Sequence, residues 1–397
     1  MHDTVYDYII VGAGIAGLYT AYKLTRNRKQ LKILILEKEK QIGGRAGTDM
    51  FYGTKIMSGA GIGRAKKDKT LLRLLKELKI PVRFYTTKIN SIGFKRINIL
   101  KTMNQLKIKY KRSPLSDRRN MTFKKFAIKH LGIRKYNKFK LSSGYTDYEN
   151  DDVCNVLYNY GMEDNVGGWK AFSVDWRNLI DQLAKRIGKT KIKTNQEVNR
   201  VSKKSGESFI LKTETNEFKT NKVVIASTVN TVRKLIKNTV YNQIESQPFL
   251  RIYGKFNKIS TQIINEKLHT FTFVKGPLQK LIPINRDKGV YMICYNDNDH
   301  TLQLQSKLKN NKRNRNYFCR LVEKALVIDH NQLLMIGMKV YNWKEGTHYY
   351  KPFGKTGLKE LIFKAQHPIE NILVVGEMVS ENQGWVNSAL ESVDKII

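Results

Sequence analysis

Residues 6–17 read YDYIIVGAGIAG, an apolar run followed directly by the pattern Gly-x-Gly-x-x-Gly. A short apolar run that ends in a turn is typical of a strand buried in a parallel sheet. Residues 15–24 then have helical spacing, and residues 32–37 form a second apolar run. Strand, glycine turn, helix and strand in this order predict a βαβ unit that binds a dinucleotide.

The glycines of this turn have different physical roles. Gly12 permits the tight turn, Gly14 lets a pyrophosphate approach the backbone, and Gly17 lets helix and strand pack closely. The helix that follows directs its free N–H groups and its positive dipole end at the phosphates. Glu37 ends the next strand, where a carboxylate can accept hydrogen bonds from both ribose hydroxyls. The cofactor-binding residues predicted for this unit are Gly12, Gly14, Ile15, Ala16, Gly17 and Glu37.

A second glycine motif, Gly43-Gly44-Arg45, lies just past the acid, in a loop that can return to the phosphates. Up to Glu37 the pattern suits NAD as well as FAD. The two glycines let the backbone come close, and a guanidinium is suited to a bidentate contact with a diphosphate. The glycine fingerprint, the acid and Gly-Gly-Arg in this order resemble the flavoproteins with two dinucleotide-binding domains.

A third motif occupies residues 372–393, which read ILVVGEMVSENQGWVNSALESV. A strand ends in Gly376-Glu377, and a turn leads through Gly384-Trp385-Val386 into a helix. This segment resembles the carboxyl-terminal signature of the flavin-containing amine oxidase family, which includes monoamine and polyamine oxidases. The resemblance implies that Glu377 meets the ribityl chain or phosphate of FAD. It also implies that the helix near Val386 points at the flavin pyrimidine, where a helix N-terminus stabilises negative charge.

Weaker matches lie between these motifs. Residues 58–64, SGAGIGR, stand where the family has a glycine-rich segment that passes the isoalloxazine. Residues 197–201, EVNRV, resemble a strand whose second residue contacts adenine through its backbone. The resemblance spans nearly the whole chain, although residues 81–170 match in position more than in sequence. It adds these cofactor contacts: Gly43, Gly44, Arg45, Gly59, Ala60, Val198, Gly376, Glu377, Trp385 and Val386.

The resemblance also implies a reaction, hydride transfer from a small amine or amino acid to flavin N5 in a dry cavity. Trp385 stands where the family has one aromatic wall of that cavity, and Tyr349 or Tyr350 is the candidate for the other. An aromatic face favours an amine by cation–π attraction. Arg251 aligns with a family lysine that reaches N5 through a water, which is a departure because arginine is larger, forked and always charged. No cysteine for covalent attachment lies near Tyr349, so we expect non-covalent FAD.

The order of signals predicts an α/β fold, with a Rossmann-like FAD-binding domain and a second α+β substrate domain. Short strand candidates after residue 190 include residues 222–226 and 333–341, and turn signals at Ser205–Gly206 and Thr215–Asn216 separate the earlier ones. We expect the FAD-binding domain to comprise residues 1–80, 191–235 and 351–397. The substrate domain is then mainly helical over residues 81–190 and contains a sheet over residues 236–350.

The formal charge of +38 would attract nucleic acid, anionic lipid or acidic proteins. Heavy use of Lys, Asn and Ile is also what an A+T-rich genome produces, and no zinc-finger spacing or aromatic ribonucleoprotein motif accompanies the charge. We therefore expect only weak, non-specific binding of polyanions. The chain has no run of ~18 apolar residues, so no membrane-spanning helix is expected. Its three cysteines lie far apart without metal spacing, which predicts a cytoplasmic protein with no metal site.

Three functions remain open at this point. The first is an FAD-dependent oxidase of a small amine or amino acid. The second is an enzyme of the carotenoid-desaturase or protoporphyrinogen-oxidase type, which shares both FAD motifs but needs an apolar membrane-docking patch not visible in the basic middle. The third is a basic scaffold stabilised by flavin, with little catalysis, which the charge and the departure at Arg251 both favour.

Overall fold

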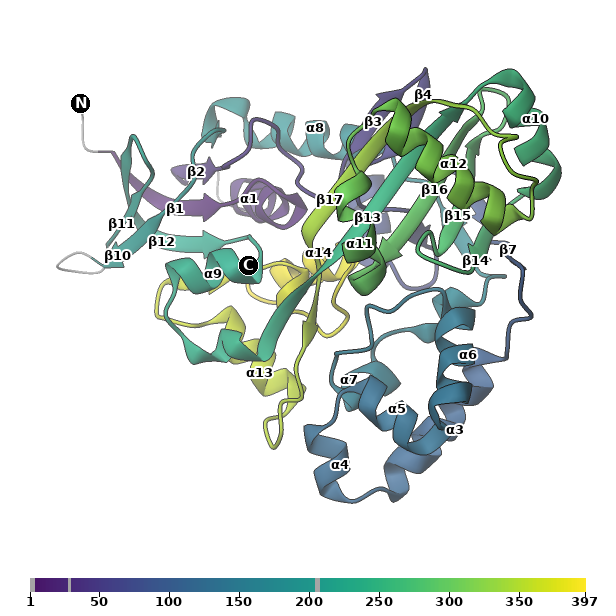
Figure 1. Ribbon diagram of the computed structural model, residues 1–397. Coiled ribbons are helices and arrows are strands. Elements are labelled where there is room, and N and C mark those ends of the chain that lie inside the picture. Colours follow the sequence, from purple (N-terminus) through teal and green to yellow (C-terminus); the bar gives the residue numbers. More distant parts are fainter. Residues whose placement is uncertain (1–3, 28–29, 204–207) are drawn as a thin grey trace.

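The computed structural model describes residues 4–27, 30–203 and 208–397, and two sheets organise it (Figure 1). The first sheet has seven strands in the order β10-β11-β12-β1-β2-β9, with β18 beside β12. These strands are β1 (Val5–Val11), β2 (Ile33–Leu36), β9 (Ile192–Lys193), β10 (Arg200–Lys203), β11 (Phe209–Lys212), β12 (Glu217–Ile225) and β18 (Ile372–Val374). The fold is mixed α/β with a Rossmann-like sheet, as predicted.

The strands of this sheet are buried on both faces, because side chains along a strand point alternately to opposite sides. Ile10 and Ile35 enter one core, together with helices α1, α8 and α14. Val11 and Leu36 enter the other, together with helices α9 and α13. These helices are α1 (Ile15–Asn27), α8 (Trp176–Ile187), α9 (Val229–Leu235), α13 (Leu358–Gln366) and α14 (Val386–Asp394). Continuous apolar runs therefore form the centre of a three-layer domain.

Strand β12 joins the two ends of the sequence in this sheet. Its first half pairs antiparallel with β11, and its second half pairs parallel with β18. The strand predicted from residue 222 therefore begins five residues earlier, at Glu217, directly after the turn predicted at Thr215–Asn216. The turn predicted at Ser205–Gly206 lies outside the described residues. Because β18 and β1 both pair with β12, the carboxyl-terminal motif lies near the amino-terminal glycine turn.

The second sheet has the order β17-β13-β16-β15-β14-β7. Its strands are β7 (Ile89–Ile92), β13 (Ile244–Phe256), β14 (Phe271–Val274), β15 (Lys280–Asn285), β16 (Val290–Asp297) and β17 (Met335–Tyr350). It is covered by helices α10 (Lys258–Lys267), α11 (Asn298–Leu304) and α12 (Lys312–Leu326). Strand β17 is much longer than the predicted strand over residues 333–341, since its later residues also pair with β13.

The antiparallel pair β13 and β17 connects the two sheets. Ile244 and Tyr350, at one end of the pair, lie in the core of the first sheet. Leu250 and Met338, further along the same strands, lie in the core of the second. Two paired strands that enter both cores hold the domains in one arrangement, and residues between those ends face the junction. Both Arg251 and His348 belong to this pair.

The helical part of the second domain forms a separate lobe, drawn in blue in Figure 1. It contains α3 (Ile99–Arg112), α4 (Leu115–Asn120), α5 (Phe123–Leu131), α6 (Ile133–Ser143) and α7 (Val153–Tyr158), around an aromatic core. The remaining elements are helix α2 (Lys69–Glu77) and the short strands β3 (Thr48–Phe51), β4 (Thr54–Met57), β5 (Gly63–Arg64), β6 (Phe84–Thr86) and β8 (Lys170–Phe172). In the described part of the chain, no helix has the length and apolar character needed to cross a membrane.

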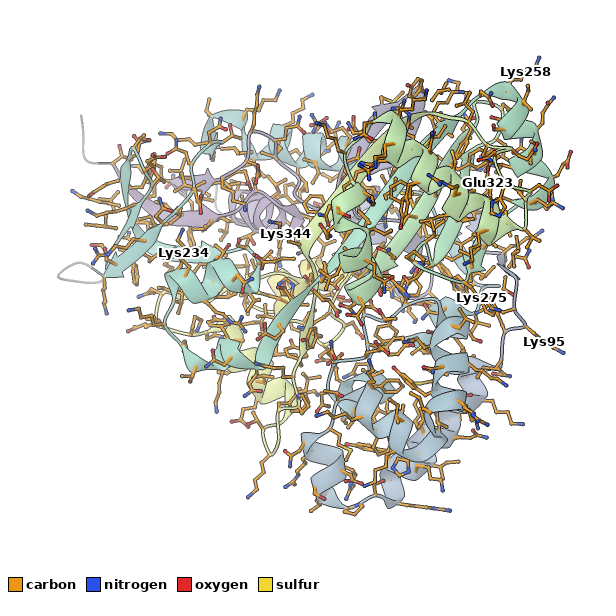
Figure 2. All side chains as sticks on the ribbon, viewed as in Figure 1. Lys95, Lys234, Lys258, Lys275, Glu323 and Lys344 are labelled. Carbon is orange, nitrogen blue, oxygen red and sulfur yellow. The ribbon has the colours of Figure 1, made fainter. Side chains whose placement is uncertain are left out.

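Positive charge is concentrated on the helical lobe. Residues 95–143 contain 16 lysines and arginines but one acidic residue, Asp117. Asp117 is buried and bonds Lys129 at 2.6 Å, so it does not offset the exposed cations. Lysines elsewhere also project from the periphery, such as Lys258 (Figure 2). Weak polyanion binding stays a prediction, and this lobe is where it would be concentrated.

The glycine turn offers a test of the fold through two substitutions in one motif. A Cβ at Gly17 would lie 2.0 Å from Gly12 O, whereas a Cβ at Gly14 would have no atom within 4 Å. We expect Gly17→Ala to destabilise the protein by roughly 1–3 kcal/mol or more, because backbone must move to admit the methyl group. Gly14→Ala, the matched control, should change stability by less than about 0.5 kcal/mol. Urea unfolding of both variants in cofactor-free form measures this; equal stabilities would contradict the packing of α1 on β1.

Candidate functional site

The two glycine motifs meet at the carboxyl ends of β1 and β2. Gly12 has a φ of +104° and donates its N–H to Leu36 O at 2.8 Å. Gly43 donates its N–H to Ala13 O at 2.9 Å, so the second loop returns to the first turn as expected. Open space lies in front of Gly14, because no atom lies within 4 Å of where its Cβ would stand. This turn and the N-terminus of α1 form a place where a phosphate can approach backbone N–H groups.

Glu37 lies directly beside this turn. One carboxylate oxygen accepts from Ala13 N–H at 2.7 Å and the other from Glu39 N–H at 2.9 Å. Its backbone carbonyl accepts from Gln196 N–H at 2.8 Å, which brings the segment before Val198 to the same edge of the sheet. The side chain of Val198 is buried in the core, so only its backbone is available to a ligand. The adenosine-binding residues expected from the sequence therefore lie together.

Glu377 connects the carboxyl-terminal motif to the rest of the site. One of its oxygens accepts from Arg45 Nη1 at 2.8 Å and also bonds His348 Nδ1. The other accepts from Gly384 N–H at 2.8 Å. Arg45 also donates to Gly346 O at 2.7 Å, on β17. Residues from the second glycine motif, from β17 and from the final motif thus converge on one carboxylate.

The pKa of Glu377 lies well below its ordinary value. Burial alone would raise that pKa, but His348, Arg45 and the Gly384 N–H outweigh it by stabilising the charged form. Val229 N–H donates to His348 Nε2 at 3.2 Å, so this nitrogen carries a lone pair and the proton is on Nδ1. The imidazole therefore donates a directed hydrogen bond from Nδ1 to Glu377. Glu377 is thus held as a carboxylate, oriented on both oxygens.

Sequence reasoning gave His348 no role, although a signal was present. His348 lies between Thr347 and Tyr349 on a strand, so its side chain points to the face opposite theirs. It is 3% exposed and faces Glu377. The available clue was a histidine directly before the two tyrosines expected at the cavity wall. The strand register that turns it toward the acid comes from β13.

Trp385 occupies the N-cap position of α14, and polar contacts hold its side chain in place. Its Nε1 donates to Asp68 Oδ2 at 2.8 Å, and the guanidinium of Arg64 lies 5.5 Å from the ring centroid. Trp176 packs edge-on against it, with ring centroids 6.3 Å apart. Asp68 is fully buried, and it also accepts from Arg64. The indole expected as an aromatic wall is therefore fixed by its neighbours, at the start of the helix beginning at Val386.

The two tyrosines expected as the second wall lie in different surroundings. Tyr350 is fully buried in the core of the first sheet, and its hydroxyl donates to Ser380 O at 2.9 Å. Tyr349 pairs across the ladder with Glu245 and is half-buried. The contacts of Tyr350 are those of a packing residue, whereas the side chain of Tyr349 is partly exposed. Their assignment to the cavity wall stays a prediction.

Arg251 is buried at the junction and reaches the segment expected near the isoalloxazine. Its Nη1 lies 3.5 Å from Ala60 O, and a Cβ on Gly61 would lie 3.5 Å from its Nη2. The guanidinium is 4.5 Å from the ring centroid of Tyr295, and its Nε has no hydrogen-bond partner. Gly59 packs against Arg45 O, so the same segment also contacts the second glycine motif. Arg251 is thus a permanent cation whose Nε donor has no hydrogen-bond partner.

Lys280 is a second buried cation near Arg251, and sequence reasoning missed it. It donates to Gly144 O at 2.7 Å and lies 3.3 Å from the ring centroid of Tyr145. Burial lowers the pKa of Lys280 to about 8, although Asp297 and Asp147 oppose that shift. The strand that carries it, β15, was not predicted because Pro283 interrupts its apolar pattern. Without the strand, nothing in the sequence places this lysine inside the domain.

The network around Glu377 predicts a pH-dependent stability. Because its pKa is lower in the folded protein, its contribution is fully present above the unfolded value of about 4.3 and is lost as pH falls toward the folded value. We expect Glu377→Gln to cost roughly 1.5–3 kcal/mol at neutral pH. That difference should shrink as pH falls below about 4. Chemical unfolding across pH measures it, with the exposed Glu370→Gln as control; a difference independent of pH would contradict the network.

Comparison with known proteins gives both sequence and structural relatives. Residues 10–78 match the family model described as NAD(P)-binding Rossmann-like domain, and residues 158–392 match that of flavin containing amine oxidoreductase. An uncharacterised protein of Acanthamoeba polyphaga mimivirus is 32% identical over 76 residues. That stretch covers 19% of this chain and only 15% of the relative's length.

Solved amine oxidases have the same fold over nearly the whole chain. Putrescine oxidase bound to putrescine matches with a TM-score of 0.77 at 13% identity, covering 99% of this chain and 98% of its own. Cyclohexylamine oxidase from Brevibacterium oxydans matches with a TM-score of 0.75 at 13% identity and the same coverage. At this identity the structural likeness establishes the fold, whereas the second family model spans more than half of the sequence. The chain therefore belongs to the flavin-containing amine oxidoreductase family.

Proposed function

We propose that this protein binds FAD non-covalently and oxidises a small amine or amino acid. The observation that carries the proposal is the convergence of Arg45, Glu377 and the N-terminal glycine turn at one edge of the first sheet. Space is present for a ligand there, since a Cβ at Gly14 or Gly376 would meet no atom within 4 Å. The unpartnered Nε of Arg251 is a buried donor that such a ligand would satisfy.

The hydrogen-bonding groups of the site suit FAD along the whole length of the cofactor. Glu37 would accept hydrogen bonds from the ribose hydroxyls, while Gly14 and the α1 N-terminus would hold the pyrophosphate with Arg45. Glu377 would meet the ribityl chain, because it is a fixed carboxylate beside Arg45. The N-terminus of α14, capped by Trp385, would face the flavin ring and stabilise negative charge there. Bound FAD supplies the two-electron acceptor that amine oxidation requires.

The residues around the reacting end of the site would select the protonation state of the amine. Arg251 keeps its positive charge at all working pH values and is 3% exposed. A cation in a buried place disfavours a second positive charge nearby, so an amine beside it binds as the neutral base. The neutral base has the lone pair that oxidation of the adjacent C–H bond needs. The ring of Trp385, fixed by Asp68, would limit the amine to one orientation.

The first test of this function is spectroscopic. Purified protein should be yellow, heat or acid should release intact FAD, and anaerobic addition of an amine substrate should bleach the flavin absorbance. Gly14→Ala should fold normally yet bind FAD more weakly, because the added methyl group occupies the space that a pyrophosphate needs. Absorbance and equilibrium dialysis measure both effects. Protein that neither takes up FAD nor is stabilised by it would refute the proposal.

Arg251 should tune the reduction potential of bound flavin. A permanent cation stabilises the anionic reduced form, so Arg251→Gln is expected to lower the midpoint potential. Each 1.4 kcal/mol of lost stabilisation corresponds to about 30 mV for a two-electron couple. Arg251→Lys, which keeps the charge, should shift the potential much less. Spectroelectrochemical titration measures all three proteins; equal potentials would mean that Arg251 does not act on the flavin.

A further inference from the structure

The positive charge of the helical lobe exceeds what the composition of the chain explains. The whole chain has 72 lysines and arginines for 34 acidic residues, whereas residues 95–143 have 16 for one. A bias in amino-acid usage that acts on the whole chain would give a similar ratio in each part. The lobe therefore has a local excess of cations, and none of the roles assigned above uses it.

Two helices of the lobe lie side by side and bring many of these cations together. Ile97 N–H donates to Ser142 Oγ at 3.0 Å, just before α3 begins and where α6 ends. Further along the two helices, Lys135 Nζ donates to Gln105 Oε1 at 2.9 Å. These contacts make α3 and α6 antiparallel neighbours, and Figure 1 shows both in the lobe that projects away from the two sheets.

The cations of α3 and α6 point away from the core of the lobe. Leu106 of α3 and Tyr136 and Phe139 of α6 are fully buried in that core. A helix repeats every 3.6 residues, so the side chains opposite these point outward. Six exposed cations lie on the outward sides of the two helices: Lys101, Lys109, Arg112, Arg134, Lys135 and Lys138. We call these six residues the basic face.

The basic face is not neutralised by acids of the lobe. Asp117 pairs with Lys129 of α5 at 2.6 Å. Glu149 is buried and lies 3.5 Å from Lys124 and 3.8 Å from Lys140. In the part of the chain that the structure describes, no cation of the basic face has a carboxylate within ion-pairing distance. The positive field of this surface therefore extends into solvent and attracts anions.

The length of the basic face suits the phosphates of a duplex. Helix α3 has 14 residues, which at 1.5 Å per residue is about 21 Å. Duplex DNA carries one negative charge per about 1.7 Å of its axis, so a surface of this length passes several phosphates at once. The exposed amides of Asn104, Gln105 and Asn137 lie among the cations. Such amides also bind phosphate and sugar oxygens.

A lipid surface suits the basic face less well. A helix that lies in a membrane interface turns an apolar face toward the lipid. The apolar faces of α3 and α6 are packed in the core of the lobe instead. Ile108 and Ile133 are exposed beside the cations, but two aliphatic side chains expose far less apolar area than a docking patch does. Charge, rather than apolar area, is what this surface presents to a partner.

A single strand also suits the basic face less well than a duplex. Single strands are held by stacking their bases on aromatic rings. Four aromatic side chains of this segment are fully buried: Phe123, Phe126, Tyr136 and Phe139. The phosphates, and not the bases, are therefore the part of a nucleic acid that this surface can bind.

We propose that the basic face binds the phosphate backbone of a nucleic-acid duplex without reading its sequence. Contacts to phosphates position a protein on a duplex but carry no base information. The face lies on α3 and α6, whereas the groups assigned to FAD lie on other elements. The inference therefore does not rest on the proposed amine oxidation and goes beyond it.

The test is a titration of the full-length protein with a labelled DNA duplex at increasing salt. If each of the six cations neutralises one phosphate, log K should fall with log salt with a slope of about −5. Lys101→Gln combined with Lys138→Gln should weaken binding at low salt at least about tenfold and reduce the slope by about 2. Both side chains are exposed, so this variant should fold like the parent.

A matched control separates the basic face from the net charge. Lys258→Gln combined with Lys344→Gln removes the same charge from exposed positions outside the lobe (Figure 2). Because salt screens distant charges, this pair should change the affinity by less than about threefold. Equal losses from the two pairs of substitutions would overturn the inference, since net charge would then govern binding.

Two further probes decide between partners in the same buffer. One is a single strand of the same sequence, and the other is vesicles of equimolar phosphatidylserine and phosphatidylcholine. We expect both to bind more weakly than the duplex at equal phosphate concentration. Tighter binding of the vesicles would assign the face to a lipid surface. Equal binding of the single strand would exclude recognition of a duplex, and either result overturns the inference.

Discussion

The arrangement of this site depends on one carboxylate, that of Glu377. Its two oxygens receive hydrogen bonds from Arg45, His348 and Gly384, which come from three separate parts of the sequence. A buried carboxylate is costly to desolvate, so it persists only when both oxygens are paired. The folded chain must therefore bring the second glycine motif, strand β17 and the final motif together. Each cofactor contact proposed for the flavin end follows from that requirement.

The long antiparallel pair β13 and β17 extends from this site into both domains. One end is packed in the first core through Ile244 and Tyr350, and the other in the second through Leu250 and Met338. Between those ends, alternation along the strands places His348 toward Glu377. Alternation along β13 places the Arg251 side chain against the segment that contains Ala60. A strand pair embedded in two cores is stiff, so these two side chains keep a fixed relation to each other.

The sequence predicted the fold class and the glycine turn because those features are local. Gly12, Gly14 and Gly17 act within one turn, and their spacing alone indicates the strand and helix on either side. The network around Glu377 was only partly visible, since Arg45 and His348 are 303 residues apart and meet through sheet register. Lys280 could not be placed at all. Its burial depends on neighbours that are distant in the sequence, and no pattern of spacing records them.

The contrast between surface and interior explains why the formal charge of +38 does not set the potential inside the buried site. Exposed lysines are screened within about 10 Å at moderate ionic strength, so their field reaches a buried site weakly. Within the protein, a few close charged groups dominate the electrostatic potential, because the effective dielectric constant is low. Arg251 is one such group, since it is buried and its Nε has no hydrogen-bond partner. The local sign of the potential, rather than the net charge, then decides the protonation state in which an amine would bind beside it.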